Sequence, residues 1–221
     1  KRQVNNTKIA VTVVYSDDKG ENWTTCELDK IYTADYYYVK FFDSDNGVIV
    51  CGYAKSNDTN ESSRIYSTSN GGESWDIVGS GPATNIIKGV VYVSSDVGFF
   101  CYDYVEGMDS NLYKTDDGGK TFAKVMLEEQ ELDSSAANPQ GQETETKTDS
   151  GKNGADSSEQ LRWGDVYKEA LTPVVDSTGI ITIYLTQGKN AVYNDGKTAA
   201  KYQSSDKGST WKYIGQVEIK D

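Results

Sequence analysis

The sequence contains no histidine, and this absence removes several kinds of catalytic and metal site from consideration. Without an imidazole there is no Ser-His-Asp or Cys-His nucleophile, no histidine general base and no histidine-containing zinc site. Cysteine is scarce as well, with three in 221 residues, and an odd, sparse set does not form a disulfide framework. Cys51 and Cys101 each end an apolar run, so we expect small buried side chains there, with a reactive or metal-binding thiol as the alternative.

The sequence also has fewer basic than acidic residues, and it has no long apolar run. The chain has 34 acidic and 22 basic side chains, a net charge of −12 and a pI near 4.5. A nucleic-acid partner is therefore not expected, because the phosphate backbone attracts basic surfaces. The longest clear apolar run, residues 48–51, is far shorter than the roughly 20 residues that cross a bilayer, so we expect no membrane span. No pattern indicates a cofactor.

The chain is rich in aromatic residues, above all tyrosine. It has 16 Tyr, 4 Trp and 5 Phe within a hydrophobic fraction of only 36%. Aromatic residues among many Gly, Ser, Thr and Asp are typical of short strands joined by tight turns. We therefore predict an all-β protein.

One eight-residue motif occurs four times, starting at residues 16, 68, 115 and 204. It has Ser or Thr first, Asp or Asn third, Gly fifth and Trp or Phe eighth. The third side chain can accept hydrogen bonds from N–H groups just downstream, the first adds a hydroxyl bond, and Gly supplies a positive φ. We expect the aromatic residue to start the returning strand of a hairpin and to pack over the turn. The four sets are Ser16, Asp18, Gly20 and Trp23; Thr68, Asn70, Gly72 and Trp75; Thr115, Asp117, Gly119 and Phe122; and Ser204, Asp206, Gly208 and Trp211.

These copies resemble the Asp-box, or BNR repeat, of sialidase-like β-propellers, and they span nearly the whole chain. In that family the motif lies in the turn between the third and fourth strands of a blade, where it supports folding and is remote from the ligand site. The resemblance therefore implies a structural role for all sixteen residues. A calcium site at Asp17 and Asp18 or at Asp116 and Asp117 is the alternative, although no EF-hand spacing follows either pair.

A second, weaker repeat precedes three of these motifs, around Gly47, Gly98 and Gly179. It predicts the hairpin between the first two strands of each blade, and the paired pattern looks like the non-enzymatic BNR-like proteins related to photosystem II stability and assembly factors. Counting from the motifs gives fourteen strands, or about three and a half four-stranded antiparallel blades, in a single domain over 1–221. Residues 128–161 form a polar insertion between blades, expected to be loop. Because a propeller must close, we expect either upstream sequence from a larger parent chain or a homodimer of seven blades.

Long connections predict where a ligand would bind. The predicted 1–2 and 3–4 turns are tight and share one face, whereas the other face carries the connections 53–63, 103–111, 187–197, 26–35 and 128–161. Irregular loops on a rigid scaffold are common binding sites. The candidate contacts, each with a locally packed side chain as the alternative, are Tyr53, Arg64, Tyr102, Tyr104, Arg162, Trp163 and Tyr193.

The resemblance leaves two functional classes open, with a purely structural module as a third. A sialidase-class glycoside hydrolase would need three arginines on the substrate carboxylate, a Tyr–Glu nucleophile and an Asp acid. This chain has only Arg2, Arg64 and Arg162, lacks the family's early Arg-Ile-Pro signature, and is too short for six blades. We therefore predict no catalytic residues and a non-catalytic module that binds protein or glycan. The start at Lys1 and the resemblance favour an extracellular or cell-surface location with the export signal removed.

Overall fold

The computed structural model describes residues 8–32, 34–53, 63–82, 85–132, 162–188 and 193–219, and these residues form four successive antiparallel sheets. The first sheet is β1 (Lys8–Tyr15) and β2 (Thr24–Tyr32). The second is β3 (Ala34–Phe41), β4 (Gly47–Tyr53), β5 (Ser63–Thr68) and β6 (Asp76–Ser80). The third is β7 (Ile87–Tyr92), β8 (Gly98–Tyr102), β9 (Leu112–Thr115) and β10 (Ala123–Lys124). The fourth is β11 (Glu169–Ala170), β12 (Val174–Val175), β13 (Ile181–Thr186), β14 (Thr198–Ser204) and β15 (Lys212–Glu218), with helix α1 (Trp163–Val166) before it and the 3-10 helix η2 (Tyr193–Gly196) inside it.

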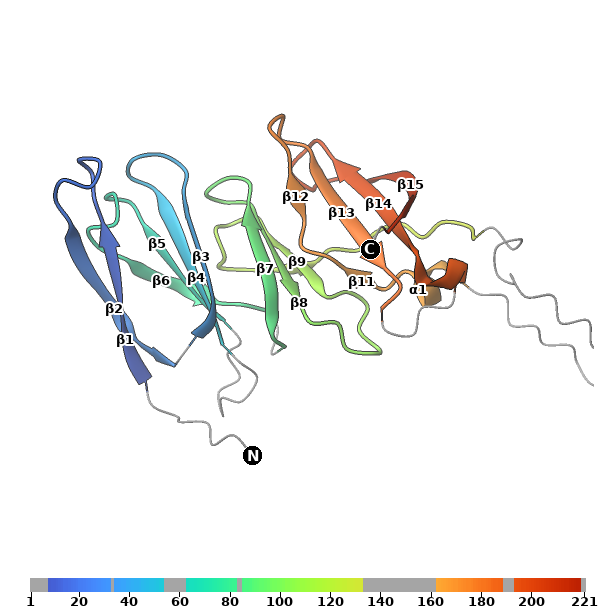
Figure 1. Ribbon diagram of the computed structural model, residues 1–221, viewed down its shortest axis with the longest axis horizontal. Helices are drawn as coiled ribbons and strands as arrows, with labels where there is room; N and C mark the ends of the chain where they lie inside the picture. Colours follow the sequence, from blue (N-terminus) through green and yellow to red (C-terminus); the bar gives the residue numbers. More distant parts are fainter. Residues whose placement is uncertain are drawn as a thin grey trace, which may run out of the picture.

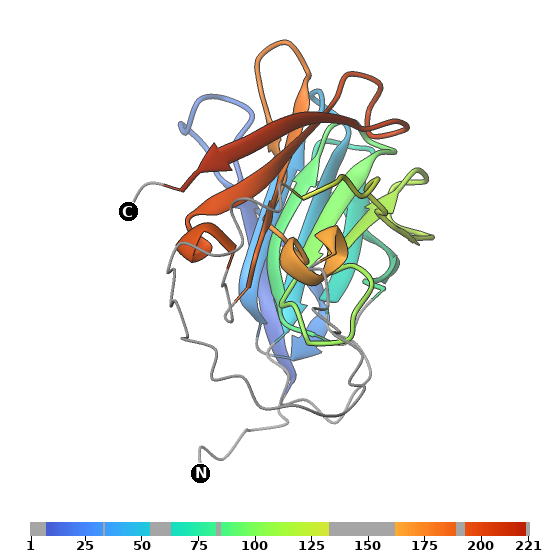
Figure 2. The same ribbon diagram turned by 90° about the vertical axis from the view of Figure 1, so that its right-hand side faces the viewer.

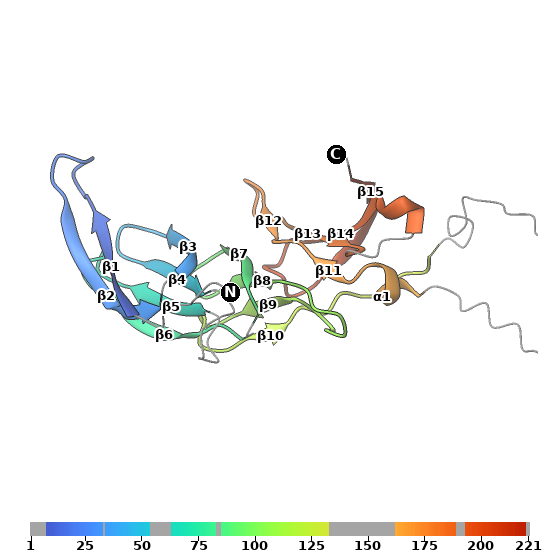
Figure 3. The same ribbon diagram turned by 60° about the horizontal axis from the view of Figure 1, so that its bottom comes forward.

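The sheets follow one another in sequence order along the long axis of the molecule (Figures 1 and 3). Each four-stranded sheet is a meander in which consecutive strands pair, and its face packs against the next sheet. This is the blade arrangement of a β-propeller, so the predicted all-β fold of three and a half blades is confirmed. The two-stranded first sheet is the half blade, because its hairpin carries the turn motif that joins the third and fourth strands elsewhere.

The strand count is fifteen among the described residues and not the predicted fourteen. The first strand of the fourth sheet is divided, since β11 and β12 both pair with β13. Pro173 lies between them and has no N–H to contribute to a ladder, which accounts for the break.

One predicted long connection, residues 26–35, is wrong. β2 continues to Tyr32 and β3 begins at Ala34, so almost all of this segment is strand. The long partner strand β1 explains the difference, because Val11 pairs with Leu28 and Ile9 pairs with Ile31. The other predicted insertion, 128–161, lies outside the described residues from 133 onward.

The core consists of apolar layers between neighbouring sheets. The second strands β4 and β8 are buried along their whole length, because a sheet covers each of their faces. Cys51 and Cys101 lie on these strands, and the prediction that they are small buried side chains is confirmed. Burial raises the pKa of the Cys51 thiol to about 11 and that of the Cys101 thiol to about 12, which keeps both protonated near neutral pH.

Tyrosine hydroxyls join the second sheet to the third. The Tyr36 hydroxyl accepts a hydrogen bond of 2.9 Å from the Val90 N–H, and the Tyr38 hydroxyl accepts one of 3.0 Å from the Tyr92 N–H. Both N–H groups belong to β7, which pairs only with β8 among the described strands and so has a free edge. The hydroxyls satisfy edge groups that would otherwise lose water on burial.

Candidate functional site

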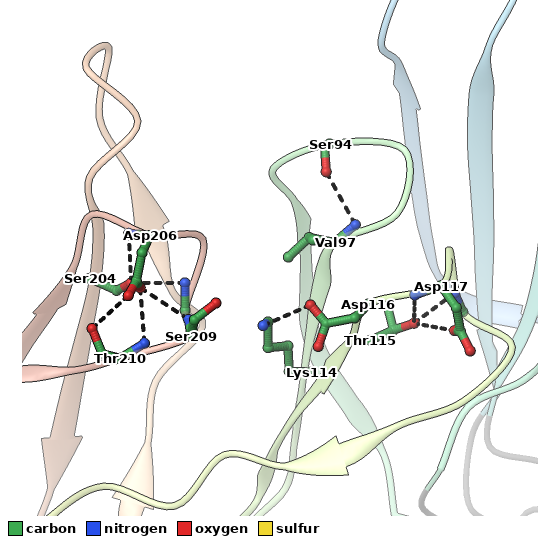
Figure 4. A network of polar contacts seen from close by, with 12 residues as sticks. Ser94, Val97, Lys114, Thr115, Asp116, Asp117, Ser204, Asp206, Ser209 and Thr210 are labelled. Carbon is green, nitrogen blue, oxygen red and sulfur yellow. Dashed lines mark hydrogen bonds and ion pairs between the residues drawn. The ribbon is translucent and has the colours of Figure 1, made fainter.

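The four turn motifs share one hydrogen-bond pattern, and Figure 4 shows part of it for the motifs that begin at Thr115 and Ser204. In every copy the first hydroxyl accepts from the N–H of the fifth residue and donates to the third side chain, which in turn accepts from the seventh N–H. In the last copy these bonds are 2.8, 2.7 and 2.9 Å long, between Ser204 and Gly208, Ser204 and Asp206, and Asp206 and Thr210. The local bonding predicted from the sequence is therefore confirmed.

These hydrogen bonds hold the motif carboxylates in the ionised form. They lower the pKa of Asp18 to about 2, through the Asn22 N–H first and then the Ser16 hydroxyl. The pKa values of Asp117 and Asp206 are lowered as well, chiefly by the hydroxyls of Thr121 and Thr210. Each carboxylate is thus committed to its own turn, which favours the structural reading of the motif.

The positive φ extends to two consecutive positions of the turn. The fifth residue is always Gly, with φ of 92°, 94°, 107° and 77° in the four copies. The fourth is also left-handed, yet it is Gly71 and Gly118 in the middle copies and Lys19 and Lys207 in the outer ones. In the middle copies its N–H donates to the neighbouring 1–2 turn, to the carbonyl of Asp45 or Asp96. A Cβ there would lie 3.1 or 3.2 Å from a backbone oxygen, so these sites favour glycine.

The eighth aromatic residue precedes the returning strand and does not start it. The strands β2, β6, β10 and β15 begin one residue after Trp23, Trp75, Phe122 and Trp211. The predicted packing over the turn holds for the three tryptophans, whose rings lie within 3.7 Å of the Cβ position of the motif glycine. Phe122 instead packs edge-on against Phe100, with ring centroids 4.9 Å apart.

The opposite end of the molecule carries the described connection between β8 and β9 and a pocket of about 400 Å³. This pocket, which we call the inter-blade pocket, lies between the third and fourth sheets. Its walls come from the β8–β9 connection, residues 125–129, α1 and strands β11 and β13. Figure 1 places α1 and this connection at the lower end, away from the hairpin turns, and Figure 2 shows α1 from its outer side.

The floor of the inter-blade pocket is apolar. Leu112, Val125 and Ala170 are buried there, and Leu127 and Leu185 are partly buried. Beneath them, the Cys101 thiol donates to the Ala170 carbonyl at 3.2 Å, so that thiol is engaged within the core.

Charged side chains form the rim of the pocket, and most of them are paired. Lys124 contacts Asp109 at 2.6 Å, Lys168 contacts Glu106 at 3.0 Å, and Arg162 lies 3.5 Å from Asp165. These pairs are largely exposed, so they contribute little to stability. The ion pair and hydrogen bond from Lys124 lower the pKa of Asp109, which keeps that carboxyl ionised.

An aromatic cluster fixes α1 beside the pocket. The Trp163 ring lies 4.7 Å from that of Tyr167 and 5.4 Å from that of Tyr213. Tyr202 joins the cluster, and its hydroxyl donates to the Glu128 carbonyl at 2.7 Å. Burial raises the pKa of Tyr202 to about 12, so the phenol remains neutral. The helix is only one turn long, and its position therefore depends on this packing.

Three of the predicted contact residues lie in the core, three line the pocket, and Arg64 belongs to neither group. Tyr53, Tyr102 and Tyr193 are almost fully buried, because a sheet or a loop covers each of them. The prediction that they are surface contacts is therefore wrong. Tyr193 is held inside by Gln187, whose amide donates to the Tyr193 carbonyl at 2.8 Å and accepts from its N–H at 3.1 Å. Arg64 lies in β5 of the second sheet, away from the pocket.

Tyr104, Arg162 and Trp163 do line the inter-blade pocket, although Trp163 is buried as part of its wall. Sequence reasoning missed the apolar floor and Asn111, which bridges the two sheets there. No local signal marks these residues, because each contact joins segments about sixty positions apart in the chain.

Two further classes of site receive no support from the part of the chain that the structure describes. No group of three or more His, Cys, Asp or Glu side chains there could hold a metal ion. Asp116, one of the carboxylates of the calcium alternative, instead contacts Lys114 at 2.7 Å. No described helix has the length and apolarity needed to cross a membrane.

Comparison with known proteins gives no family. No protein-family model matches the sequence, and no curated protein matches it. Among solved structures, a GH74 enzyme from Niastella koreensis aligns with 92% of this chain at 16% identity and a TM-score of 0.44. A structure of YCF48 bound to D1 peptide aligns with 91% of this chain and 74% of its own at 15% identity and a TM-score of 0.36. The chain spans 26% of the length of the GH74 enzyme.

Proposed function

We propose that this chain is a non-catalytic binding module of the Asp-box, or BNR, propeller type, and that it holds an apolar group of a protein or glycan in the inter-blade pocket. The observation that carries the proposal is the pocket itself. It has an apolar floor, a polar and charged rim and a volume of about 400 Å³. This volume lies within the range of about 300–1,000 Å³ that is typical of ligand pockets.

The pairing of two rim carboxylates with basic side chains supports binding over catalysis. A glycoside hydrolase needs one carboxyl kept protonated as an acid beside a second carboxylate. At this pocket Asp109 is exposed and held ionised by Lys124, and Asp165 is exposed beside Arg162. The arginines also argue against the sialidase class, because Arg64 lies in β5 and Arg162 lies beside α1, at separate places along the row of sheets (Figure 1).

A pocket-blocking variant with a matched control tests the proposal. Gly164 is exposed on α1, and a Cβ there would meet only the end of the flexible Glu129 side chain, at 2.6 Å. Gly164→Trp should therefore obstruct the mouth without disturbing the core, whereas Gly164→Ala should leave it open. The labelled 221-residue chain and both variants are applied to a glycan microarray and a peptide array.

The expected result is a set of probes that bind the parent chain and Gly164→Ala but lose at least about tenfold in signal with Gly164→Trp. Probes that bind all three proteins equally would contradict the pocket. Turnover of a fluorogenic sialoside by the parent chain would overturn the non-catalytic part of the proposal. An extracellular or cell-surface location belongs to the same proposal, and fractionation of the native source with an antibody to this chain tests it.

A further inference from the structure

A second pocket, of about 230 Å³, lies between the second and third sheets at the end that carries the hairpin turns. We call it the turn pocket. Its walls come from the hairpin turns and adjoining strand ends of the second sheet and from both hairpin turns of the third. It shares no residue with the inter-blade pocket, which lies at the opposite end of the molecule.

Two small side chains of the second sheet make room for the turn pocket. Val48 pairs with Ser67 near the start of β4, and Phe99 pairs with Lys114 at the same place in β8. Because paired residues share a face, Val48 and Ser67 face the third sheet just as Phe99 and Lys114 face the fourth. Valine and serine therefore stand where phenylalanine and lysine stand one sheet later.

The larger side chains occupy the equivalent space between the third and fourth sheets. The Phe99 ring lies edge-on to Trp211, with ring centroids 6.0 Å apart, and the Lys114 side chain is only 12% exposed. Between the second and third sheets the counterpart of Trp211 is Phe122, which packs against Phe100 instead. The turn pocket is therefore a feature of one interface and not of the repeat in general.

Two opposite charges line the turn pocket without pairing. Asp76 begins β6 directly opposite Ser67, so its carboxylate lies on the face that looks toward the third sheet. Lys120 lines the other wall, from the turn between β9 and β10. Neither side chain forms an ion pair with another residue of the described ranges. Both charges are therefore available to a ligand.

The third charged residue of the turn pocket, Asp117, is committed to its own turn. Its carboxylate accepts hydrogen bonds from the Thr121 N–H at 2.8 Å, the Thr121 hydroxyl at 2.6 Å and the Lys120 N–H at 3.0 Å. One carboxylate and one ammonium group therefore remain, on opposite walls. The floor between them is apolar and consists of Phe42, Val48 and Val78.

We propose that the turn pocket binds a free α-amino acid with a small apolar side chain. The ammonium group of the ligand lies against the Asp76 carboxylate, its carboxylate faces Lys120, and its side chain covers the apolar floor. A zwitterion satisfies both charges, whereas an anion, a cation or a neutral sugar leaves at least one of them without a partner. This is a separate pocket, so the proposal goes beyond the proposed function and does not rest on it.

The size and the hydroxyl groups of the turn pocket agree with such a ligand. Its volume of about 230 Å³ is below the roughly 300–1,000 Å³ of pockets that enclose drug-sized ligands, so the space suits a single small molecule. Ser95 lies on the same wall as Lys120, where a hydroxyl donates to a bound carboxylate. Ser67 lies on the same wall as Asp76, where a hydroxyl accepts from a bound ammonium group.

Titration of the 221-residue chain with L-leucine, followed through its backbone amide shifts by NMR, tests the proposal. Because Asp76 and Lys120 are exposed, we expect saturable binding with a dissociation constant on the order of 1 mM, with the shifts concentrated at the lining residues. N-acetyl-L-leucine, which lacks the ammonium group, and L-leucinamide, which lacks the carboxylate, should bind at least about tenfold more weakly. Asp76→Asn and Lys120→Gln should weaken leucine binding by a similar factor. Val48→Phe, which introduces the side chain found at the next interface, should abolish it.

Asp116→Asn is the matched control, because Asp116 is an exposed carboxylate of the turn that carries Lys120 and contacts Lys114 on the side of the fourth sheet (Figure 4). It should leave leucine binding within about twofold. Unchanged thermal midpoints would show that the variants fold. No saturable binding of leucine, or equal binding to the Asp76→Asn chain, would overturn the proposal. Either leucine derivative binding as tightly as leucine would overturn it in favour of a peptide terminus, and saturable shifts of the same amides with glucose would overturn it in favour of a sugar.

Discussion

Asn111 and Ala170 join the third and fourth sheets through a reciprocal pair of hydrogen bonds. The Asn111 amide donates to the Ala170 carbonyl at 2.9 Å, and its side-chain oxygen accepts from the Ala170 N–H at 2.8 Å. The same amide donates to the Tyr102 carbonyl at 2.8 Å. A buried side chain thus acts as a short piece of strand between the β8–β9 connection and β11, directly below the inter-blade pocket.

Replacing Asn111 should destabilise the chain more than replacing an exposed asparagine. Asn111→Ala removes a hydrogen bond from each of three buried backbone groups and leaves the Ala170 carbonyl with only the weak Cys101 thiol donor, which costs about 3 kcal/mol in the free energy of unfolding. Asn22→Ala, at an exposed turn, should cost about 0.5 kcal/mol or less. Urea titration followed by tryptophan fluorescence measures the free energy of unfolding of both variants. Equal losses would show that the Asn111 bridge does not stabilise the chain.

Removing the hydroxyls of Tyr36 and Tyr38 should weaken the contact between the second and third sheets. Each Tyr→Phe change leaves a β7 N–H without its acceptor, and we expect a loss of about 1–2 kcal/mol for each. Because both hydroxyls bind the same strand edge, the loss of stability in the double variant should differ from the sum of the two single losses. Tyr37→Phe is the matched control, since the Tyr37 ring is half exposed on the opposite face of β3. A destabilisation of Tyr37→Phe as large as that of its neighbours would contradict the assignment.

Substitutions at the fourth position of the turn motif should change stability in opposite directions in two of the copies. Gly118→Ala places a Cβ 3.2 Å from the Ser95 carbonyl oxygen at a φ of 76° and should destabilise the chain by about 1–2 kcal/mol. Lys207→Gly relieves a left-handed lysine, and should stabilise the chain by up to about 1 kcal/mol. Thermal unfolding of the two variants at one pH tests the pair, and shifts of the same sign would refute the explanation.

Acid should destabilise the chain through its turn motifs. The folded state lowers the pKa of Asp18 to about 2 and also lowers the pKa values of Asp117 and Asp206. A lowered folded pKa means that the unfolded chain binds more protons between the two values. The stabilisation is therefore complete above the unfolded pKa of about 4 and is lost as the pH falls toward 2.

A reciprocal exchange isolates this effect. Asn70 already fills the third position in one motif, where its amide oxygen accepts the Ser74 N–H at 3.0 Å. Asp206→Asn should consequently fold with a flatter dependence of the thermal midpoint on pH between 2.5 and 6, and Asn70→Asp should steepen it. Parallel curves for the parent and both variants would rule out the turn carboxylates as the source.

The four turns show how far local sequence can carry a prediction. All the bonds between the first, third, fifth and seventh residues of a motif lie within one turn, so spacing alone specifies them. The same applies to the glycine at the fifth position, whose φ is a property of its own backbone. The length of β2 was missed because only pairing with β1 fixes it, and that register is non-local.

The sequence by itself determined that this is an all-β chain of repeated hairpins, their number, and the residues that shape each turn, because those interactions are short in range. Only the tertiary structure decided which tyrosines are core and which are surface. Tyr53, Tyr102 and Tyr193 lie in or beside predicted connections, so the sequence alone suggests surface contacts. In the structure, neighbouring sheets and Gln187 enclose them. The inter-blade pocket and the exposure of Tyr37, Val39 and Phe41 on β3 have the same origin, since burial depends on what the adjacent sheet supplies and not on the strand itself.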